Sequence, residues 1–176
     1  MPNEVIVKLN SIGSFCVGKT SLIRRYTENK FSEDYLPTLG VDITVKRGVI
    51  INGKTPPVRI VLMDTAGEEK FGSLRKTYFE GSLGCIAVYD ISNSNTFSDL
   101  DYWIGEYRKV AGDKAIIAII GNKIDLANKR KVTEEEGKQY ARSQGSPFYE
   151  CSAKIGGKII PKVFIELVRK CLYKLN

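Results

Sequence analysis

The residues with the clearest chemical meaning form an octet near the N-terminus. Residues 13–20 match the pattern G-x-x-x-x-G-K-[ST]. Glycines at the two ends allow the backbone to curl so that successive N–H groups point at phosphate oxygens. Lys19 can reach the terminal phosphates, and the Thr20 hydroxyl can ligate Mg²⁺. The octet therefore predicts a phosphate-binding loop rather than a glycine loop with an incidental lysine, with contacts from Gly13, Ser14, Phe15, Cys16, Val17, Gly18, Lys19, Thr20 and Ser21.

A second group of chemical residues begins at Asp64, directly after the apolar run Val58–Met63. An aspartate at the end of a strand can hold Mg²⁺ through the water shell of the ion. Gly67 lies three residues later, where the lack of a side chain lets a backbone N–H approach a terminal phosphate. Asp64 is therefore predicted as a metal residue, and Gly67 as a phosphate contact with a part in catalysis.

Two further polar segments each follow an apolar run. Asn122-Lys123-Ile124-Asp125 follows Ala115–Ile120, and Ser152-Ala153-Lys154 follows Phe148–Cys151. Ligands of open α/β sheets bind at the carboxyl ends of parallel strands. The Asp125 carboxylate can accept two hydrogen bonds from an N–H/NH₂ edge, which guanine has and adenine lacks. The two segments therefore predict a guanine site.

The elements that must position these residues alternate between apolar β-branched runs and helical patterns, which is typical of βαβ units and a largely parallel sheet. Asn52-Gly53 predicts a tight turn between two strands, which would form the antiparallel edge. The expected strands are Val5–Leu9, Val41–Val45, Val58–Met63, Leu83–Tyr89, Ala115–Ile120 and Phe148–Cys151, the last three as buried runs.

Helices are expected from near Lys19 and over Asn95–Val110, Thr133–Ser143 and Ile159–Leu175. Ser94 or Asn95 is expected to cap the second, and Thr133 with Glu136 has the spacing of a capping box. Pro161 would lie in a first turn, where its missing N–H costs little. Without a linker or repeat, residues 1–176 are expected to form one domain.

Composition narrows the possible classes of protein. The chain has 176 residues, a net charge of +7, four cysteines far apart and no histidine. These features argue against a zinc site and a Cys–His pair, and they indicate a reducing, cytoplasmic setting. No segment resembles a nucleic-acid-reading module, an N-terminal signal peptide or a membrane-spanning helix.

With these motifs in this order, the chain resembles the Ras superfamily and, within it, the Rab family. The resemblance implies a Ras-like P-loop G domain: a six-stranded, mostly parallel sheet with one antiparallel edge strand and about five helices. It also implies GTP or GDP with Mg²⁺ as cofactors. By position, the resemblance implies that Thr38 would ligate Mg²⁺ beside Thr20 and Asp64. Phe31 would pack on the guanine ring, Asn122 and Asp125 would hydrogen-bond to it, and Lys123 and Lys154 would lie on its two faces. The Ala153 N–H would donate to the guanine oxygen, and Ser152 would belong to the same loop as Ala153.

Three residues depart from the family pattern. Glu68 follows Gly67 where relatives usually have a glutamine that orients the attacking water, so its effect on hydrolysis has either sign, and a plain loop role stays open. Phe15 replaces a small residue and would crowd the region that an activator's arginine approaches. Cys16 replaces a glycine, and it is either a thiol activated near Lys19 or a small filler.

The resemblance also implies partners. Effectors, exchange factors and activators would bind through segments 31–43 and 64–80, and the domain is expected to be a monomer that binds no nucleic acid. Relatives usually carry a prenylated tail that places them on the cytosolic face of endomembranes. This chain stops at Asn176, and Cys171 has the periodicity of a core residue. Either the tail was removed, or the domain acts without its own anchor.

Three functions remain to be weighed. The leading hypothesis is a slow Mg²⁺-dependent GTPase that acts as a switch, with Lys19, Gly67 and Glu68 as the catalytic residues, in vesicle trafficking. The second is a pseudo-GTPase, a module that binds nucleotide without significant hydrolysis. The third, an ATP-using P-loop enzyme, is disfavoured because Asn122 to Asp125 specify guanine.

Overall fold

The computed structural model describes residues 4–34, 37, 38, 40–49, 51, 57–66 and 72–175. Their centre is a six-stranded sheet in the order β2-β3-β1-β4-β5-β6. All neighbours are parallel except β2 and β3, which confirms the predicted antiparallel edge strand. The strands are β1 Val5–Ile12, β2 Val41–Val49, β3 Val58–Thr65, β4 Gly84–Asp90, β5 Ile116–Asn122 and β6 Phe148–Glu150.

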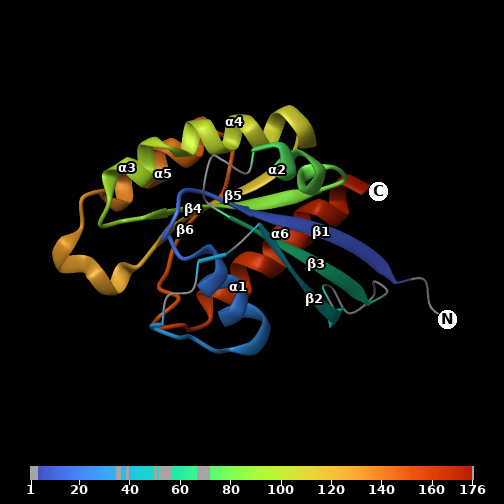
Figure 1. The fold of residues 1–176 in the computed structure, drawn as a ribbon, viewed down its shortest axis with the longest axis horizontal. Helices are drawn as coiled ribbons and strands as arrows, with labels where there is room; N and C mark the ends of the chain where they lie inside the picture. The colour runs from blue at the N-terminus through green and yellow to red at the C-terminus, as the bar shows by residue number, and fades with distance from the viewer. Residues whose placement is uncertain are drawn as a thin grey trace.

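Helices cover both faces of this sheet (Figure 1). The helices α1 Lys19–Glu28 and α6 Ile159–Leu175 lie on one face, below the sheet in that view. On the opposite face lie α2 Gly72–Phe79, α3 Ser94–Ser98, α4 Leu100–Ala111 and α5 Glu134–Ser143. A 3₁₀ helix, η2 Ile124–Lys129, follows β5. None of the helices in the described part of the chain is long and apolar enough to cross a lipid bilayer.

Each face of the sheet has its own hydrophobic core. One core joins β1, β3 and β4 to α1 and α6, and it contains Cys171, as predicted from its periodicity. The other joins the opposite face of the sheet to α2, α4 and α5, and it contains Tyr89 and Trp103. Strand β4 lies between the two cores and is buried along its whole length, as expected for a strand with helices on both faces.

Two expectations about the strands need correction. Strand β1 runs to Ile12, three residues past its predicted end, because it pairs with β3 and β4 at once and its polar side chains have buried partners. The Ser11 hydroxyl, for example, donates to Asp64 (2.9 Å). The predicted buried run at Phe148–Cys151 is a short, half-buried strand, because β6 lies at the edge of the sheet. The predicted Asn52-Gly53 turn lies outside the described residues.

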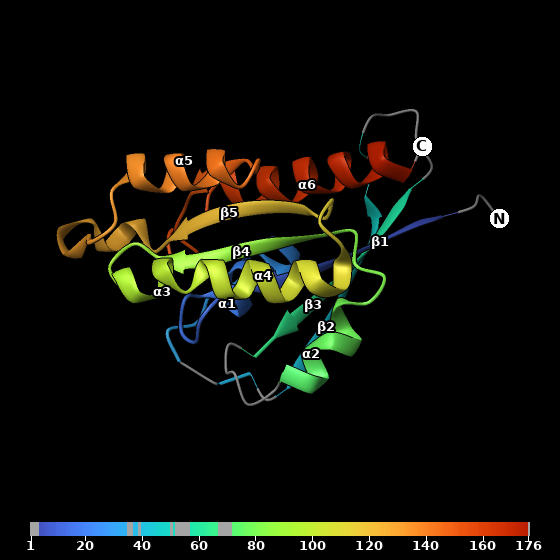
Figure 2. The same ribbon diagram turned by 90° about the horizontal axis from the view of Figure 1, so that it is seen from above.

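The helix predicted over Asn95–Val110 is two successive helices, α3 and α4, that meet at Asp99 (Figure 2). The Asp99 carboxylate accepts a hydrogen bond from the Ser14 hydroxyl (2.7 Å), which ties this junction to the glycine-rich loop. The cap of α3 is Asn93, whose side chain accepts from the Asn95 N–H, and not Ser94 or Asn95 as predicted. With α2, which the sequence did not indicate, the described chain has six α-helices rather than about five.

The predicted start of α5 is confirmed. The Thr133 hydroxyl accepts from the Glu136 N–H (3.2 Å), and the Glu136 carboxylate accepts from the Thr133 N–H (2.7 Å). These two bonds satisfy two N–H groups that the helix itself leaves unpaired. Pro161 lies in the first turn of α6, also as predicted.

We expect Thr133→Ala to lower the free energy of unfolding by about 1 kcal/mol, because the substitution leaves N–H groups at the start of α5 without their cap. Urea denaturation followed by circular dichroism measures this difference. Thr133→Ser is the matched control, since it keeps the hydroxyl. Equal stability of all three proteins would show that the capping box contributes nothing here.

Candidate functional site

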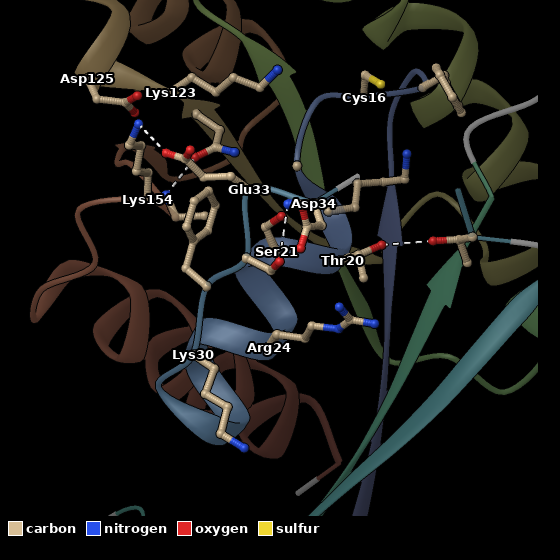
Figure 3. Close-up of a pocket in the computed structure, with 18 of the residues that line it drawn as sticks. Cys16, Thr20, Ser21, Arg24, Lys30, Glu33, Asp34, Lys123, Asp125 and Lys154 are labelled. Carbon is tan, nitrogen blue, oxygen red and sulfur yellow. Dashed lines mark hydrogen bonds and ion pairs between the residues drawn. The ribbon is translucent and has the colours of Figure 1, made fainter. Parts of the chain in front are cut away.

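A cavity of about 330 Å³ opens where the loops after β1, β5 and β6 meet (Figure 3). In that view Thr20 lies at one end, and Lys123, Asp125 and Lys154 lie at the other. These loops follow the carboxyl ends of neighbouring strands, as expected for ligand sites of open α/β sheets. The described residues that line the cavity are Phe15, Cys16, Gly18, Lys19, Thr20, Ser21, Arg24, Lys30, Phe31, Ser32, Glu33, Asp34, Thr38, Thr65, Asn122, Lys123, Asp125, Ala153 and Lys154.

The two glycines of the octet are required by close packing. Gly13 has φ 134°, and a Cβ there would lie 2.2 Å from the Val88 carbonyl oxygen. Gly18 has φ 95°, and its Cβ would lie 2.3 Å from Nδ2 of Asn122. A side chain at Gly13 would displace the loop from strand β4, and one at Gly18 would displace it from Asn122. The loop therefore forms the close-packed turn before α1 that the octet predicts.

Lys19 lies inside this loop and is buried, with only 7% of its surface exposed. Its ammonium donates to the carbonyl oxygens of Gly13 and Ser14, each at 2.8 Å. A buried cation at the start of a helix favours an anion beside it, because both the charge and the N–H groups of α1 attract negative charge. This arrangement suits the phosphate groups of a nucleotide.

Three side chains whose oxygen atoms could ligate a metal ion meet beside the loop. The Thr20 hydroxyl donates to the Asp64 carboxylate and lies 2.9 Å from the Thr38 hydroxyl. Thr38 itself lies 3.5 Å from the same carboxylate oxygen. The structure thus brings together the three residues predicted to hold a metal, from α1, β3 and the segment between α1 and β2. Hydroxyl and carboxylate oxygens are the ligands that Mg²⁺ prefers, so this donor set fits that ion.

Asp64 is 2% exposed, and burial raises the pKa of its carboxyl above the ordinary value. Hydrogen bonds from Thr20 and Ser11 oppose this shift, as does the nearby charge of Lys19. A buried carboxylate gains stability when a cation lies against it. The electrostatics of Asp64 are therefore consistent with a cation held at this point.

Asn122 connects the phosphate side of the cavity to the guanine side. Its side-chain NH₂ donates to the Val17 carbonyl oxygen (2.8 Å), inside the loop. Its side-chain oxygen accepts from the Ala153 N–H (3.1 Å). Asn122 is 1% exposed, so breaking either bond would leave a buried polar group unpaired. The N–H of Ala153, predicted to meet the guanine oxygen, has Asn122 as its partner in this structure.

The remaining base-reading side chains are held by their own partners. The Ser152 hydroxyl donates to the Asp125 carboxylate and so orients it. The Lys123 ammonium pairs with Asp90 (2.7 Å). Burial favours the neutral form of Asp90, but Lys123 and hydrogen bonds from Ser92 outweigh it and hold the pKa of Asp90 below its ordinary value. The ion pair anchors the tip of Lys123 and leaves its aliphatic stem along the cavity.

The structure does not bring every predicted residue to the cavity wall. Val17 is fully buried beneath the loop, and Ser14 turns away from the cavity and accepts from the Trp103 indole N–H (3.2 Å). Gly13, Asp64 and Ser152 act from behind the wall through the contacts described above. Phe15 and Cys16 are exposed at the wall. Gly67 and Glu68 lie outside the described residues.

Sequence reasoning missed several residues of the wall. Lys30, Ser32, Glu33 and Asp34 flank the predicted Phe31, and their only signal was that proximity. The Lys154 ammonium pairs with Glu33 across the opening (2.6 Å), as Figure 3 shows. The other missed residues are Arg24 and Thr65.

Comparison with known proteins agrees with this geometry. The family model described as Ras family matches residues 8–173. The chain is 39% identical over 165 residues to the Ras-related protein Rab-21 of Homo sapiens, which covers 94% of this chain and 72% of that protein. It is 40% identical over 155 residues to the Ras-related protein RabC of Dictyostelium discoideum, covering 88% and 78%.

A plant relative, the Ras-related protein RABA6b of Arabidopsis thaliana, is 34% identical over 165 residues, which is 94% of this chain and 70% of that protein. The matched residues 8–173 include the octet, Asp64 and both guanine segments. With the loop, the three oxygen donors and the guanine segments arranged around one cavity, this chain belongs to the Ras family of small GTPases and is Rab-like.

Proposed function

We propose that this protein binds GTP and GDP with Mg²⁺, hydrolyses GTP slowly and acts as a conformational switch. One observation carries the proposal: the phosphate loop, the Thr20 and Thr38 hydroxyls and Asp125 line a single cavity, and the Asp64 carboxylate lies directly behind the two hydroxyls. Each group matches one part of a guanine nucleotide. The phosphates, the metal and the base have separate partners in the right order along one cleft.

At the phosphate end, Lys19 and the backbone of residues 13–18 bind the phosphate oxygens. Thr20, Thr38 and Asp64 would hold Mg²⁺, which neutralises charge on the phosphates when it is bound. The glycines at both ends keep the loop close to the ligand, because side chains there would clash with the sheet and with Asn122. Binding at this end depends on the backbone and on Lys19, so the Phe15 side chain contributes little to it.

At the base end, Asp125 accepts from the N–H/NH₂ edge of guanine, while Lys123, Lys154 and Phe31 enclose the ring. Adenine lacks that edge, so an ATP molecule would cover the carboxylate without supplying those two hydrogen bonds. Unpaired buried polar groups make such discrimination large. This is the reason that the base end selects guanine.

The switch would operate through segments 31–43 and 64–80. Thr38 lies in the first segment, and its hydroxyl contacts Thr20 and Asp64 in the structure. A terminal phosphate with its metal would favour this position of Thr38, and its loss would release the segment. Effectors, exchange factors and activators would read the difference, as the resemblance to Rab proteins suggests. The role would be in vesicle trafficking, on the cytosolic face of endomembranes if the whole protein carries a lipidated tail.

Hydrolysis is proposed to be slow because of Phe15 and Glu68. Phe15 belongs to the phosphate loop and lines the cavity with 44% of its surface exposed, where it would obstruct an arginine supplied by an activator. By its place after Gly67 in the Rab pattern, Glu68 would bring negative charge toward the terminal phosphate, and it lacks the amide donor of a glutamine. The same two residues favour the second candidate, a pseudo-GTPase that binds nucleotide without significant hydrolysis.

The base specificity is tested by substitution of Asp125. We expect the parent protein to bind GTP and GDP much more tightly than ATP, and Asp125→Asn to weaken guanine nucleotides roughly a hundredfold, since two charge-assisted hydrogen bonds are lost. The variant should favour xanthine nucleotides, whose carbonyl can accept from the new amide. Calorimetry with the four nucleotides measures this, with Asp113→Asn as the control on an exposed carboxylate. Equal affinity of the parent for ATP and GTP would refute the guanine site.

The hydrolysis proposal is tested by single-turnover assays of the parent, Glu68→Gln, Phe15→Ser and the double variant. We expect the parent to be slow and the double variant to be the fastest, because the glutamine orients water and the serine opens the approach to the phosphate. An activating arginine contributes on the order of 10³–10⁵ in rate when it can reach the site. A double variant that is no faster than the parent, with or without an activator, would show that neither residue slows hydrolysis. No measurable turnover in the parent would favour the pseudo-GTPase.

A further inference from the structure

Arg25 lies in the last turn of α1, behind the cavity wall, and its guanidinium donates to two chain segments, the loop at Ala153–Lys154 and the end of its own helix at Asn29. Nε donates to the Ala153 carbonyl oxygen (2.9 Å), and Nη2 donates to the Lys154 carbonyl oxygen (3.0 Å). Nη1 donates to the Asn29 carbonyl oxygen (3.0 Å). Hydrogen bonds from a charged donor are about twice as strong as neutral ones. Arg25 thus ties the end of α1 to the guanine segment.

Both segments held by Arg25 carry residues that line the cavity. Ala153 and Lys154, whose carbonyl oxygens accept from Arg25, are lining residues on one side, and Phe31 is one on the other. Asn29 is the C-cap of α1, in a left-handed conformation with φ 54°, and it leads directly to Phe31. The guanidinium carbon also lies 5.9 Å from the centre of the Phe31 ring. Fixing these carbonyl oxygens therefore fixes the walls on two sides of the base.

The exposed ion pair across the opening holds the base end less firmly than the hydrogen bonds of Arg25. The ion pair of Lys154 with Glu33 has side chains that are 56% and 73% exposed, and exposed pairs contribute little to stability. Arg25 is half-buried, and its bonds go to backbone atoms rather than to a mobile side chain. We therefore expect Arg25, and not the Glu33 pair, to keep the base end closed.

The guanine segment is also shaped to admit Arg25. Gly156 has φ 80°, and a Cβ there would lie 3.2 Å from Nε of Arg25. The Gly156 N–H donates to the Ser152 carbonyl oxygen (2.8 Å), which closes the turn around residues 153–155. A side chain at this position would press on the guanidinium. Gly156 therefore offers a second, independent way to disturb the contact.

From this geometry we propose that Arg25 is a positioning residue that sets how slowly the bound nucleotide dissociates. The inference rests on the proposed function, since it assigns a role at the same guanine site. Release of the base requires the loop at Ala153–Lys154 and the segment at Asn29–Phe31 to part. Arg25 bonds both, so it raises the barrier to opening and pre-organises the pocket before the nucleotide arrives. Such contacts act mainly on the dissociation rate.

The experiment measures the release of a fluorescent GDP from the whole chain. We expect Arg25→Gln to release GDP roughly tenfold faster, which corresponds to about 1.4 kcal/mol. Arg25→Lys should also be fast, because one ammonium cannot reach three separated carbonyl oxygens. Arg142→Gln is the control on α5: it removes the same charge and two side-chain hydrogen bonds, one to a carbonyl oxygen and one to a carboxylate, away from the cavity. Gly156→Ala should act in the same direction as Arg25→Gln.

A second measurement, made after Mg²⁺ has been chelated, distinguishes a positioning role of Arg25 from a general loss of protein stability. EDTA loosens the phosphate end, so an effect confined to the base end should multiply the release rate by the same factor with and without the metal. An effect of Arg25→Gln that disappears in EDTA, or a release rate equal to that of the parent, would overturn the inference alone. So would an Arg25→Lys variant that matches the parent, since charge and not geometry would then act. A parent that binds no guanine nucleotide would overturn the proposed function as well.

Discussion

The site depends on one buried side chain, Asn122, which joins the phosphate loop, 105 residues before it at Val17, to the loop 31 residues after it at Ala153. Its amide bonds the Val17 carbonyl oxygen on the phosphate side and the Ala153 N–H on the guanine side. Both partners are buried, so neither bond can be exchanged for water without cost. The distance between the phosphate end and the base end of the cavity is therefore set by one amide. The close approach of Gly18 to the same Nδ2 shows how little space this link leaves.

Side chains of opposite charge lie close together around the cavity. Lys19 and Asp64 are both buried, and each has hydrogen-bond partners in the structure. This arrangement places a positive group suited to phosphate and a negative group suited to a cation within one loop system. At the base end the ion pairs of Lys123 and Lys154 anchor the tips of long side chains. Their aliphatic stems are then available for stacking without a large loss of conformational entropy.

The phosphate loop is also held by contacts from the helices on the opposite face of the sheet. The junction of α3 and α4 at Asp99 is bonded to Ser14, and Trp103 donates to the same hydroxyl. The phosphate loop is therefore held from the side of α4 as well as from the guanine side. Arg25 separately ties the end of α1 to the loop at Ala153 and Lys154, at the base end of the cavity. A loop with this many supports on different elements can keep its backbone N–H groups in place while the segments around Thr38 change with the nucleotide.

The sequence by itself determined the fold class, the antiparallel edge, the α5 cap and most of the motif residues that meet at the cavity. These follow from local chemistry: glycine at positive φ, polar residues at strand ends, and hydrophobic periodicity. Phe31 and Thr38 were expected only from the resemblance to Rab proteins. Only the tertiary structure decided the break at Asp99, the helix α2, the half-buried β6 and the contacts of Asn122 and Arg25. Each of these depends on partners from distant parts of the chain. Spacing along the sequence carries no record of which carbonyl oxygen a buried amide or guanidinium will reach, because that is settled only when the elements pack.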